Sequence, residues 1–180
     1  MSPIYLLIGA PASGKSTLAK ALAKSYAKCI HVPVDDLRSM VISGVIHPSA
    51  TWTPQLIEQL QLARQSALST ALNYQRSNFA VIIDDFWDPN SQMQEYQSLW
   101  KARNFVPVLL YPKPEQAKVR NQGRYAPGTF RGYIDEGIDI VYKSLQDAVA
   151  GLATDGWLVL DTTDDTVDDS VERILASRRQ

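Results

Sequence analysis

Residues 9–16 read Gly-Ala-Pro-Ala-Ser-Gly-Lys-Ser and come directly after the apolar run Ile-Tyr-Leu-Leu-Ile. A glycine, four spacers and then Gly-Lys-Ser is the spacing of a loop that wraps phosphate groups with its backbone N–H groups. In such a loop Lys15 reaches the β- and γ-phosphates, the Ser16 hydroxyl binds Mg²⁺, and Thr17 is an extra contact to an α-phosphate. The motif needs a strand before it and a helix after it, and the sequence predicts both. The residues expected to bind ATP are Gly9, Ala10, Pro11, Ala12, Ser13, Gly14, Lys15, Ser16 and Thr17.

Two pairs of aspartates close apolar runs further along the chain. Asp35 and Asp36 follow residues 29–34, and Asp84 and Asp85 follow residues 79–83. Ligands of open parallel sheets bind outside the carboxyl ends of the strands, which is where both pairs are expected. Asp35 is then placed to take the proton of an acceptor hydroxyl as a general base, and Asp84 or Asp85 to orient Mg²⁺. Adjacent carboxylates point to different sides, so we expect one of each pair in the site, and a helix N-cap is the alternative for Asp36.

Basic residues complete the predicted chemistry. Arg38, three residues after Asp35, is expected to bind an anionic part of the acceptor. Arg120 and Arg124 are four residues apart on one helical face, where they are expected to stabilise the charge on a transferring phosphoryl group. The alternative is a basic helix surface in solvent. Glycines at 123, 128 and 132 predict that residues 118–134, called the lid below, are mobile.

Five aspartates between residues 161 and 169 suggest a second metal site at first sight. We favour a simpler interpretation. Asp161 is expected to end a strand, and the others to lie at the start of the last helix, where negative charge is favourable.

The elements that must position these residues follow from the hydrophobic pattern. Continuous apolar runs at 4–9, 29–34, 79–84, 105–111 and 157–162 predict buried parallel strands. Between them, helical spacing predicts helices at 15–28, from Pro54 onward, and at 90–103, 114–122, 133–151 and 166–178. The alternation predicts an α/β fold of the P-loop NTPase type, a three-layer sandwich around a five-stranded parallel sheet. We expect one domain over residues 1–180, with mobile segments at 43–53 and 121–134.

Composition limits the classes of protein that fit. The chain has 180 residues, of which 45% are hydrophobic and 21% charged, with a net charge of −1 and one cysteine. Near-neutral charge argues against a surface coated with nucleic acid, although a local basic groove stays open. One cysteine allows no internal disulfide, and we expect neither a signal peptide nor a membrane-spanning segment. We therefore expect a cytoplasmic protein with no membrane partner.

The remaining motifs separate the phosphate-binding classes. The guanine-reading Asn-Lys-x-Asp segment of GTPases and the signature of ABC transporters are both absent, and the chain is too short for a motor. A small kinase-like domain is the class that fits.

Together "GAPASGKS", "VDDLR", "VIIDD" and "VRNQGR" resemble the kinase group that contains polynucleotide 5′-hydroxyl kinases, chloramphenicol phosphotransferase and the zeta toxins. The resemblance implies that Asp35 is the general base and that Arg38 binds the acceptor's phosphate. It also matches Asp85 to the strand-end aspartate, and Arg120 and Arg124 to the lid. The lid here has one residue more between its arginines than the common spacing of that group.

We therefore expect an ATP- and Mg²⁺-dependent kinase that phosphorylates a hydroxyl of a small or nucleic-acid acceptor, such as a nucleotide or oligonucleotide. A sugar, antibiotic or nucleotide-sugar acceptor is the first alternative. A non-catalytic ATP-binding switch is the second. The sequence leaves the acceptor and the oligomeric state open.

Overall fold

A five-stranded sheet forms the centre of the molecule in the computed structural model, which describes residues 2–47, 52–88 and 93–178. Its strands are β1 (Ile4–Gly9), β2 (Cys29–Pro33), β3 (Ala80–Asp84), β4 (Phe105–Leu110) and β5 (Leu158–Leu160). They pair in the order β2-β3-β1-β4-β5, and every pairing is parallel. The strand that carries the phosphate-binding sequence is therefore the central one.

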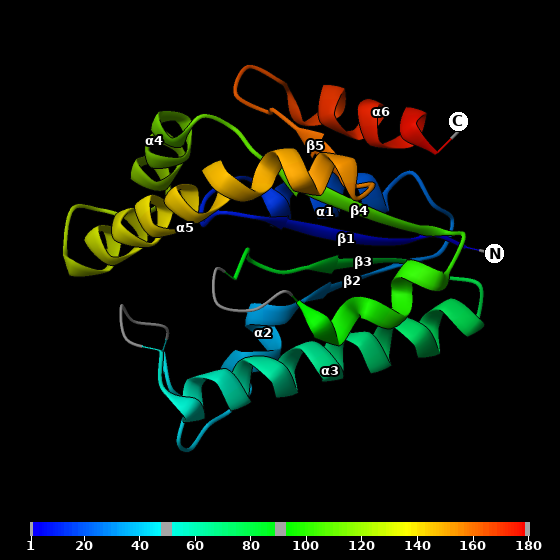
Figure 1. Cartoon of the computed structure of the whole chain (residues 1–180), viewed down its shortest axis with the longest axis horizontal. Coiled ribbons are helices and arrows are strands. Elements are labelled where there is room, and N and C mark those ends of the chain that lie inside the picture. The colour runs from blue at the N-terminus through cyan, green and yellow to red at the C-terminus, as the bar shows by residue number, and fades with distance from the viewer. Residues whose placement is uncertain (1, 48–51, 89–92, 179–180) are drawn as a thin grey trace.

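Helices cover both faces of this sheet (Figure 1). Helices α1 (Lys15–Ala23) and α6 (Val167–Ser177) pack on one face, with Leu18 and Ile174 against Tyr5 and Leu7. The other face is covered by α3 (Pro54–Arg76), α5 (Thr129–Thr154) and the 3-10 helix η1 (Gln94–Lys101). This arrangement confirms the predicted three-layer α/β fold. Of the helices in the described residues, none combines the length and hydrophobicity that a membrane crossing requires.

The continuous apolar runs form strands because the sheet is covered on both sides. Every residue of β1 and of β3 is buried, so neither strand alternates polar with apolar residues. Helix α3 begins at Pro54, as predicted, and its N-cap Thr53 accepts a hydrogen bond from the Leu56 N–H at 3.2 Å. For β1, β3 and α3, the structure that the local sequence predicts is therefore also the one that tertiary burial favours.

One short helix, α2 (Val34–Ser39), was not predicted. It starts directly after β2 and carries Asp35 and Asp36 in its first turn, where negative charge favours a helix. The N-cap residue is Pro33, so the alternative that Asp36 caps a helix is wrong. A helix of six residues has too little length to show a hydrophobic period.

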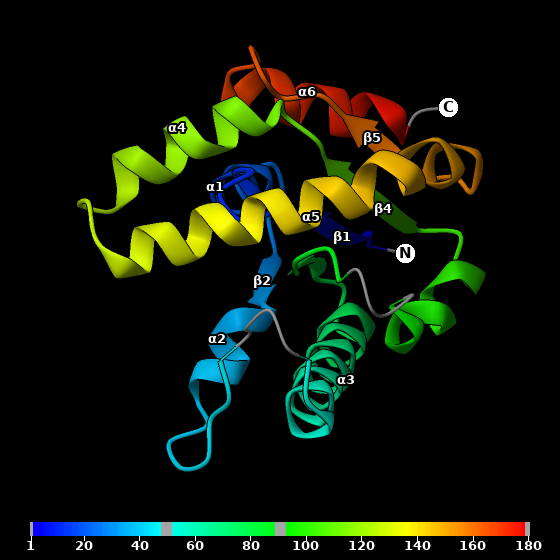
Figure 2. The ribbon, with the colours of Figure 1, turned by 60° about the vertical axis from the view of Figure 1, so that its left-hand side comes forward.

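The lid is mostly helical (Figures 1 and 2). Helix α4 (Pro114–Arg124) runs past Gly123, and α5 starts at Thr129, four residues earlier than predicted. The two helices lie side by side beyond the sheet. The buried Asn121 amide joins them, because its Nδ2 donates to Arg131 O at 3.2 Å and to Asp135 Oδ1 at 2.7 Å. Residues 118–134 therefore belong to a helical hairpin, and both of its helices extend further into the lid than the expected bounds of 122 and 133.

Two other predicted segments fall partly outside the described residues. Of the helix expected at 90–103, the structure describes residues 93–103 and shows η1 as a 3-10 helix. The structure does not describe residues 48–51 of the segment 43–53, nor residues 90–92 of the expected helix.

A buried ion cluster fixes the chain where β3 ends. Arg64 of α3 is 1% exposed, and its Nε donates to Asp85 Oδ2 at 2.8 Å while its Nη1 donates to Asp88 Oδ2 at 2.9 Å. The Tyr96 hydroxyl of η1 donates to Asp85 Oδ2 at 3.1 Å, and the Phe86 N–H donates to Asp85 Oδ1 at 2.8 Å. Burial raises the pKa of the Asp85 carboxyl, and the guanidinium of Arg64 acts in the opposite direction. The cluster joins α3, the end of β3 and η1.

We predict that Arg64→Met destabilises the fold by about 3–5 kcal/mol, because it leaves two buried carboxylates without their cation. Chemical denaturation measures this change. Arg76→Met is the matched control, since Arg76 is exposed near the end of the same helix, and a change within about 0.5 kcal/mol is expected there. Equal midpoints for Arg64→Met and wild type would show that the cluster does not hold the fold.

Candidate active site

The turn between β1 and α1 has the backbone of a phosphate-binding loop. A Cβ on Gly9, whose φ is 154°, would lie 2.6 Å from Leu110 O and 2.9 Å from Ser13 Oγ, so only glycine fits there. Gly14, with φ of 102°, is the N-cap of α1 and brings no side chain to the first turn. The N–H groups at the start of α1 thus face the loop, which suits an anion.

The lysine of the motif lies over its own loop. Lys15 Nζ donates to Ala10 O at 3.0 Å and to Gly9 O at 3.4 Å. Ser16 and Thr17 are exposed on the first turn of α1. The loop therefore offers an ammonium, two hydroxyls and a helix N-terminus around one small region.

The alternation of side chains along β3 separates the two aspartates that follow it. Ile82 packs on the face of the sheet that α1 covers, and Ile83 packs on the face that α3 covers. Asp84 is on the same side as Ile82 and therefore points to the start of α1, while Asp85 points to α3 and Arg64. The residues alone left open which of the two faces the loop, and the resemblance matched Asp85 to the strand-end position. The structure instead directs Asp84 toward the loop and Asp85 toward Arg64.

Asp84 has an electropositive environment. His31 of β2 lies with its Nε2 3.3 Å from Asp84 Oδ2, and Lys15 and the Ser16 hydroxyl also interact with the carboxylate. Burial alone would raise the pKa of Asp84. The hydrogen bond from His31, the charge of Lys15 and the hydrogen bond from Ser16 outweigh burial and lower it. Asp84 is thus a carboxylate beside the loop, close to the Ser16 hydroxyl.

Asp35 and Arg38 lie together on α2, beyond the ends of β2 and β3. Arg38 Nη1 donates to Asp35 Oδ1 at 3.1 Å, and its Nη2 donates to Ile46 O at 3.3 Å. The side chain of Asp35 is 73% exposed, whereas that of Arg38 is 11% exposed. Burial raises the pKa of Tyr133 on α5, and the charges of Arg38 and Asp35 also act on it. The start of α2 therefore lies near the lid hairpin.

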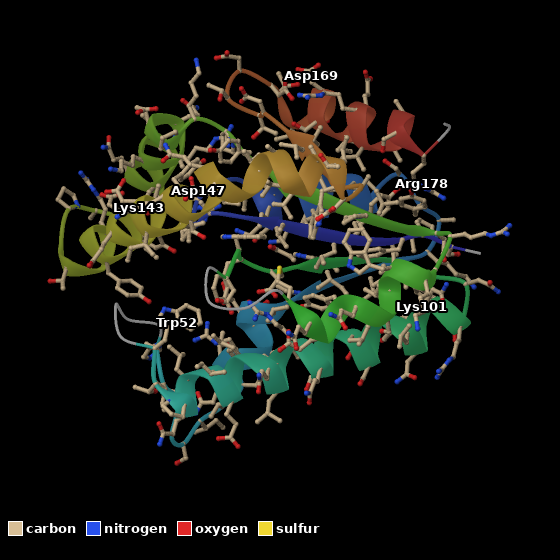
Figure 3. All side chains as sticks on the ribbon, viewed as in Figure 1. Trp52, Lys101, Lys143, Asp147, Asp169 and Arg178 are labelled. Carbon is tan, nitrogen blue, oxygen red and sulfur yellow. The ribbon has the colours of Figure 1, made fainter. Side chains whose placement is uncertain are left out.

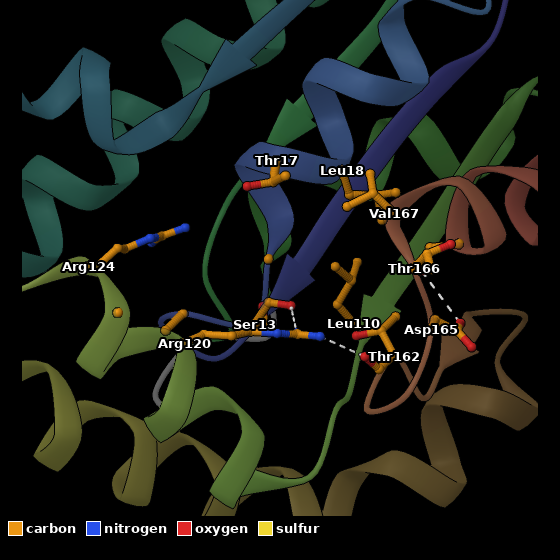
Figure 4. A pocket seen from close by; sticks show the side chains of 14 residues that line it. Ser13, Thr17, Leu18, Leu110, Arg120, Arg124, Thr162, Asp165, Thr166 and Val167 are labelled. Atoms are coloured by element: carbon orange, nitrogen blue, oxygen red, sulfur yellow. Dashed lines mark hydrogen bonds between the residues drawn. The ribbon is translucent and has the colours of Figure 1, made fainter.

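A cavity of about 340 Å³ lies on the other side of the loop, toward β4 and β5 (Figure 4). Its apolar walls are Leu18, Leu110 and Val167. The loop, the first turn of α1, the lid helix α4 and the segment from β5 into α6 supply the rest of the lining: Ala12, Ser13, Gly14, Thr17, Arg120, Gly123, Arg124, Thr162, Asp165, Thr166 and Ser170.

Arg120 and Arg124 both belong to this cavity, and their surroundings differ. Arg120 bridges two elements, because its Nη1 donates to Ser13 O at 2.8 Å and its Nη2 donates to Thr162 O at 2.7 Å (Figure 4). Arg124 is exposed and projects from α4 into the same cavity. The lid hairpin is thus joined to the phosphate-binding loop through Arg120.

Sequence reasoning missed the polar groups of the cavity. The hydroxyls of Ser13 and Thr162 are buried and have no hydrogen-bond partner among the described residues. Ser13 was predicted only as part of the phosphate-binding loop, and Thr162 was not predicted as a site residue. Thr162 follows β5 at the carboxyl edge of the sheet, so the strand-end rule that selected Asp35 applied to it as well.

The five aspartates between 161 and 169 lie near the start of α6, in agreement with the simpler interpretation. Asp169 forms a capping box with Thr166, and Asp165 pairs with Arg173. Figure 3 shows Asp169 at the outer start of α6. Within the described residues, no three side chains of His, Cys, Asp or Glu are arranged to hold a metal ion.

Comparison with solved structures gives the fold. A gluconokinase from Sinorhizobium meliloti superposes with a TM-score of 0.64 at 15% identity, over 98% of this chain and 91% of that one. Shikimate kinase from Acinetobacter baumannii, solved with shikimate, gives 0.63 at 16% identity, over 98% and 93%. The tunicamycin resistance protein of Deinococcus radiodurans gives 0.63 at 14% identity, over 98% and 95%.

Comparison with curated protein sequences gives no match. Residues 4–160 match the profile of the family AAA_33, described as an AAA domain, and this match spans all five strands, the loop, the acidic pairs and the lid. The chain therefore belongs to the AAA domain family AAA_33 and has the fold of a P-loop kinase.

Proposed function

We propose that the protein is a kinase that uses ATP and Mg²⁺ to phosphorylate a hydroxyl group. One observation carries the proposal: the phosphate-binding loop lies between two sites. The cavity of about 340 Å³ is on the β4–β5 side, and the exposed Asp35 with Arg38 is on the β2–β3 side. A nucleotide-binding switch needs only the first of these sites. A kinase needs both, because donor and acceptor must meet at the γ-phosphate.

The residues around the loop fit a nucleoside triphosphate. The loop N–H groups, the N-terminus of α1 and Lys15 would hold the phosphates. The apolar walls of the cavity and its buried hydroxyls on Ser13 and Thr162 suit a nucleoside, which combines a flat apolar ring with polar edges. The cavity volume lies at the lower end of the range for small-ligand pockets, about 300–1,000 Å³.

Ser16 and Asp84 would hold Mg²⁺ together with the phosphates. Mg²⁺ commonly takes one or two protein oxygens and completes its shell with phosphate and water, so a serine and one carboxylate suffice. The ion would neutralise charge on the transferring phosphoryl group. Asp85 is unsuited to this role, because both of its oxygens already accept hydrogen bonds inside the cluster with Arg64.

Asp35 is the proposed general base. Its exposed carboxylate stands on the acceptor side, with Arg38 beside it to bind an anionic group of the acceptor. The solved neighbours named above include a shikimate kinase and a gluconokinase, which supports a small acceptor. The resemblance of the motifs to polynucleotide 5′-hydroxyl kinases supports a nucleotide or oligonucleotide. An acceptor that carries both a hydroxyl and a negative charge satisfies both observations.

Arg120 and Arg124 are the proposed lid residues. Arg120 holds the lid hairpin to the loop, and Arg124 has the exposure needed to reach bound phosphates. Their guanidinium groups would stabilise charge that develops on the phosphoryl group during transfer.

The first prediction of the proposed function concerns the reaction itself. Incubation with γ-labelled ATP, Mg²⁺ and separate pools of nucleotides, oligonucleotides, sugars, sugar acids and antibiotics should label one pool. Lys15→Ala should lower that transfer more than about a hundredfold, equivalent to roughly 2.7 kcal/mol of transition-state stabilisation. Release of free phosphate with no labelled acceptor in any pool would instead favour the ATP-binding switch.

The second prediction concerns the base. Asp35→Asn should slow single-turnover transfer by about 10²–10⁴-fold and leave ATP affinity unchanged, because Asp35 contacts the acceptor rather than the nucleotide. Asp36→Asn is the matched control, one residue further on the same helix and also exposed, and should transfer at nearly the wild-type rate. If Asp35→Asn transfers phosphate at the wild-type rate, Asp35 is not the general base.

The third prediction separates the two aspartates at the end of β3. Calorimetry should show that Mg²⁺ tightens ADP binding in wild type, and that Asp84→Asn removes most of this gain. Asp85→Asn should keep the Mg²⁺ effect and lower the unfolding free energy, because it disturbs the Arg64 cluster. The opposite pattern, with the Mg²⁺ effect lost only in Asp85→Asn, would place the metal on the other aspartate.

A further inference from the structure

One partly buried polar contact near the loop has so far been described only for its effect on the pKa of Asp84. His31, in the middle of β2, lies with its Nε2 3.3 Å from Asp84 Oδ2. The side chains are 14% and 5% exposed, so solvent contributes little to holding either of them. A histidine within an otherwise apolar strand is thus paired with the carboxylate that faces the phosphate-binding loop.

The sheet register brings the two residues together. His31 is aligned with Ile82 in the parallel pairing of β2 and β3, and Ile82 packs on the side of α1. Asp84 is two residues beyond Ile82, so both side chains leave the sheet on the same side. The imidazole therefore approaches the carboxylate from within the sheet, whereas Ser16 and Lys15 approach it from the loop.

The direction of the hydrogen bond follows from the charge state of Asp84. An ionised carboxylate only accepts hydrogen bonds, so in the state that binds a cation the hydrogen lies on Nε2 of His31, which donates it to Asp84 Oδ2. Such a bond restrains rotation of the carboxylate and occupies one of its oxygens.

The other two neighbours of Asp84 have different tasks. In the function proposed above, Lys15 and Ser16 turn to the phosphates and to Mg²⁺ when a nucleotide binds. His31 has no such task, because it lies in a strand behind the carboxylate. It is the neighbour that can hold Asp84 in one orientation both before and after the nucleotide enters.

We propose that His31 is a positioning residue, which orients the Asp84 carboxylate for the divalent cation of a metal–nucleotide complex. The inference rests on the proposed function, since it requires that Asp84 faces the metal. Residues that orient a metal ligand typically contribute about 10–100-fold to metal affinity. The effect expected of His31 is therefore on the metal rather than on the nucleotide.

The test measures Mn²⁺ binding in the presence of ADP by electron paramagnetic resonance, and ADP binding without metal by calorimetry. His31→Leu should weaken Mn²⁺ binding by about 10–100-fold and leave metal-free ADP affinity unchanged. His31→Gln keeps an N–H donor and should recover most of the Mn²⁺ affinity. His47→Leu, at the other histidine, which is exposed, is the matched control and should bind like wild type.

A double-mutant cycle makes the test specific to the pair. In the Asp84→Asn background, His31→Leu should cause little further loss of Mn²⁺ affinity, because the carboxylate it orients is already gone. Thermal unfolding checks that each variant is folded, and His31→Met replaces the leucine variant if that one is not.

Three results would overturn the inference in different ways. If wild type binds Mn²⁺ with ADP and His31→Leu binds it equally well, His31 does not position Asp84, and the proposed function is untouched. Equal losses in metal-free ADP affinity and in Mn²⁺ affinity would show a general structural role instead. If wild type itself binds no Mn²⁺ with ADP, the proposed function fails and the inference with it.

Discussion

The path of the chain at the end of β3 decides which groups reach the phosphate-binding loop. Arg64 holds Asp85 and Asp88 in a buried cluster on the α3 side of the sheet. Because successive side chains of a strand point to opposite sides, holding Asp85 toward α3 directs Asp84 toward α1. A slip of one residue in β3 would exchange the two carboxylates. The buried cation thus supports the site although it lies on the far side of the sheet.

The loop itself depends on a second constraint, the close approach of its backbone to the neighbouring strand. Gly9 lies against Leu110 O so closely that no side chain fits, and this brings the ends of β1 and β4 together. Arg120 then connects the loop to the lid hairpin and to the end of β5. The cavity on this side is therefore bounded by the close backbone approach at Gly9 and by the Arg120 side chain, whereas the opposite side carries the charged side chains of α2.

The sequence was informative where a motif and its context agreed. The spacing of the loop, the strand before it and the helix after it predicted the central feature of the fold, and continuous apolar runs predicted all five strands. Alternation along a strand showed that Asp84 and Asp85 point to opposite sides of the sheet. It did not show which of them points to the loop, because that depends on which face α1 covers. Arg64 was missed because a charged residue on a long helix is usually in solvent. Its burial depends on two carboxylates more than 20 residues away in the chain.

Other features could not be predicted because local composition suggested the opposite. Glycines 123 and 132 suggested a mobile lid, and helices were expected to end at 122 and to begin at 133. Both glycines lie in helices, whose pairing through Asn121 outweighs their low helix propensity. His31 lies in an apolar run, and its partner is known only from the register of β2 with β3. Long-range pairing therefore decided the parts of the site that sequence reasoning left open.

The central claim is that the loop, Ser16 and Asp84 form one site for a metal–nucleotide complex, from which Asp85 is excluded. Anomalous diffraction from crystals grown with Mn²⁺ and ADP tests it most directly. The account predicts one Mn²⁺ peak between the nucleotide phosphates, Ser16 Oγ and the Asp84 side of the β3 end, with the Arg64–Asp85 pair intact. A peak beside Asp85 with that pair broken, or ADP bound away from the loop, would contradict it.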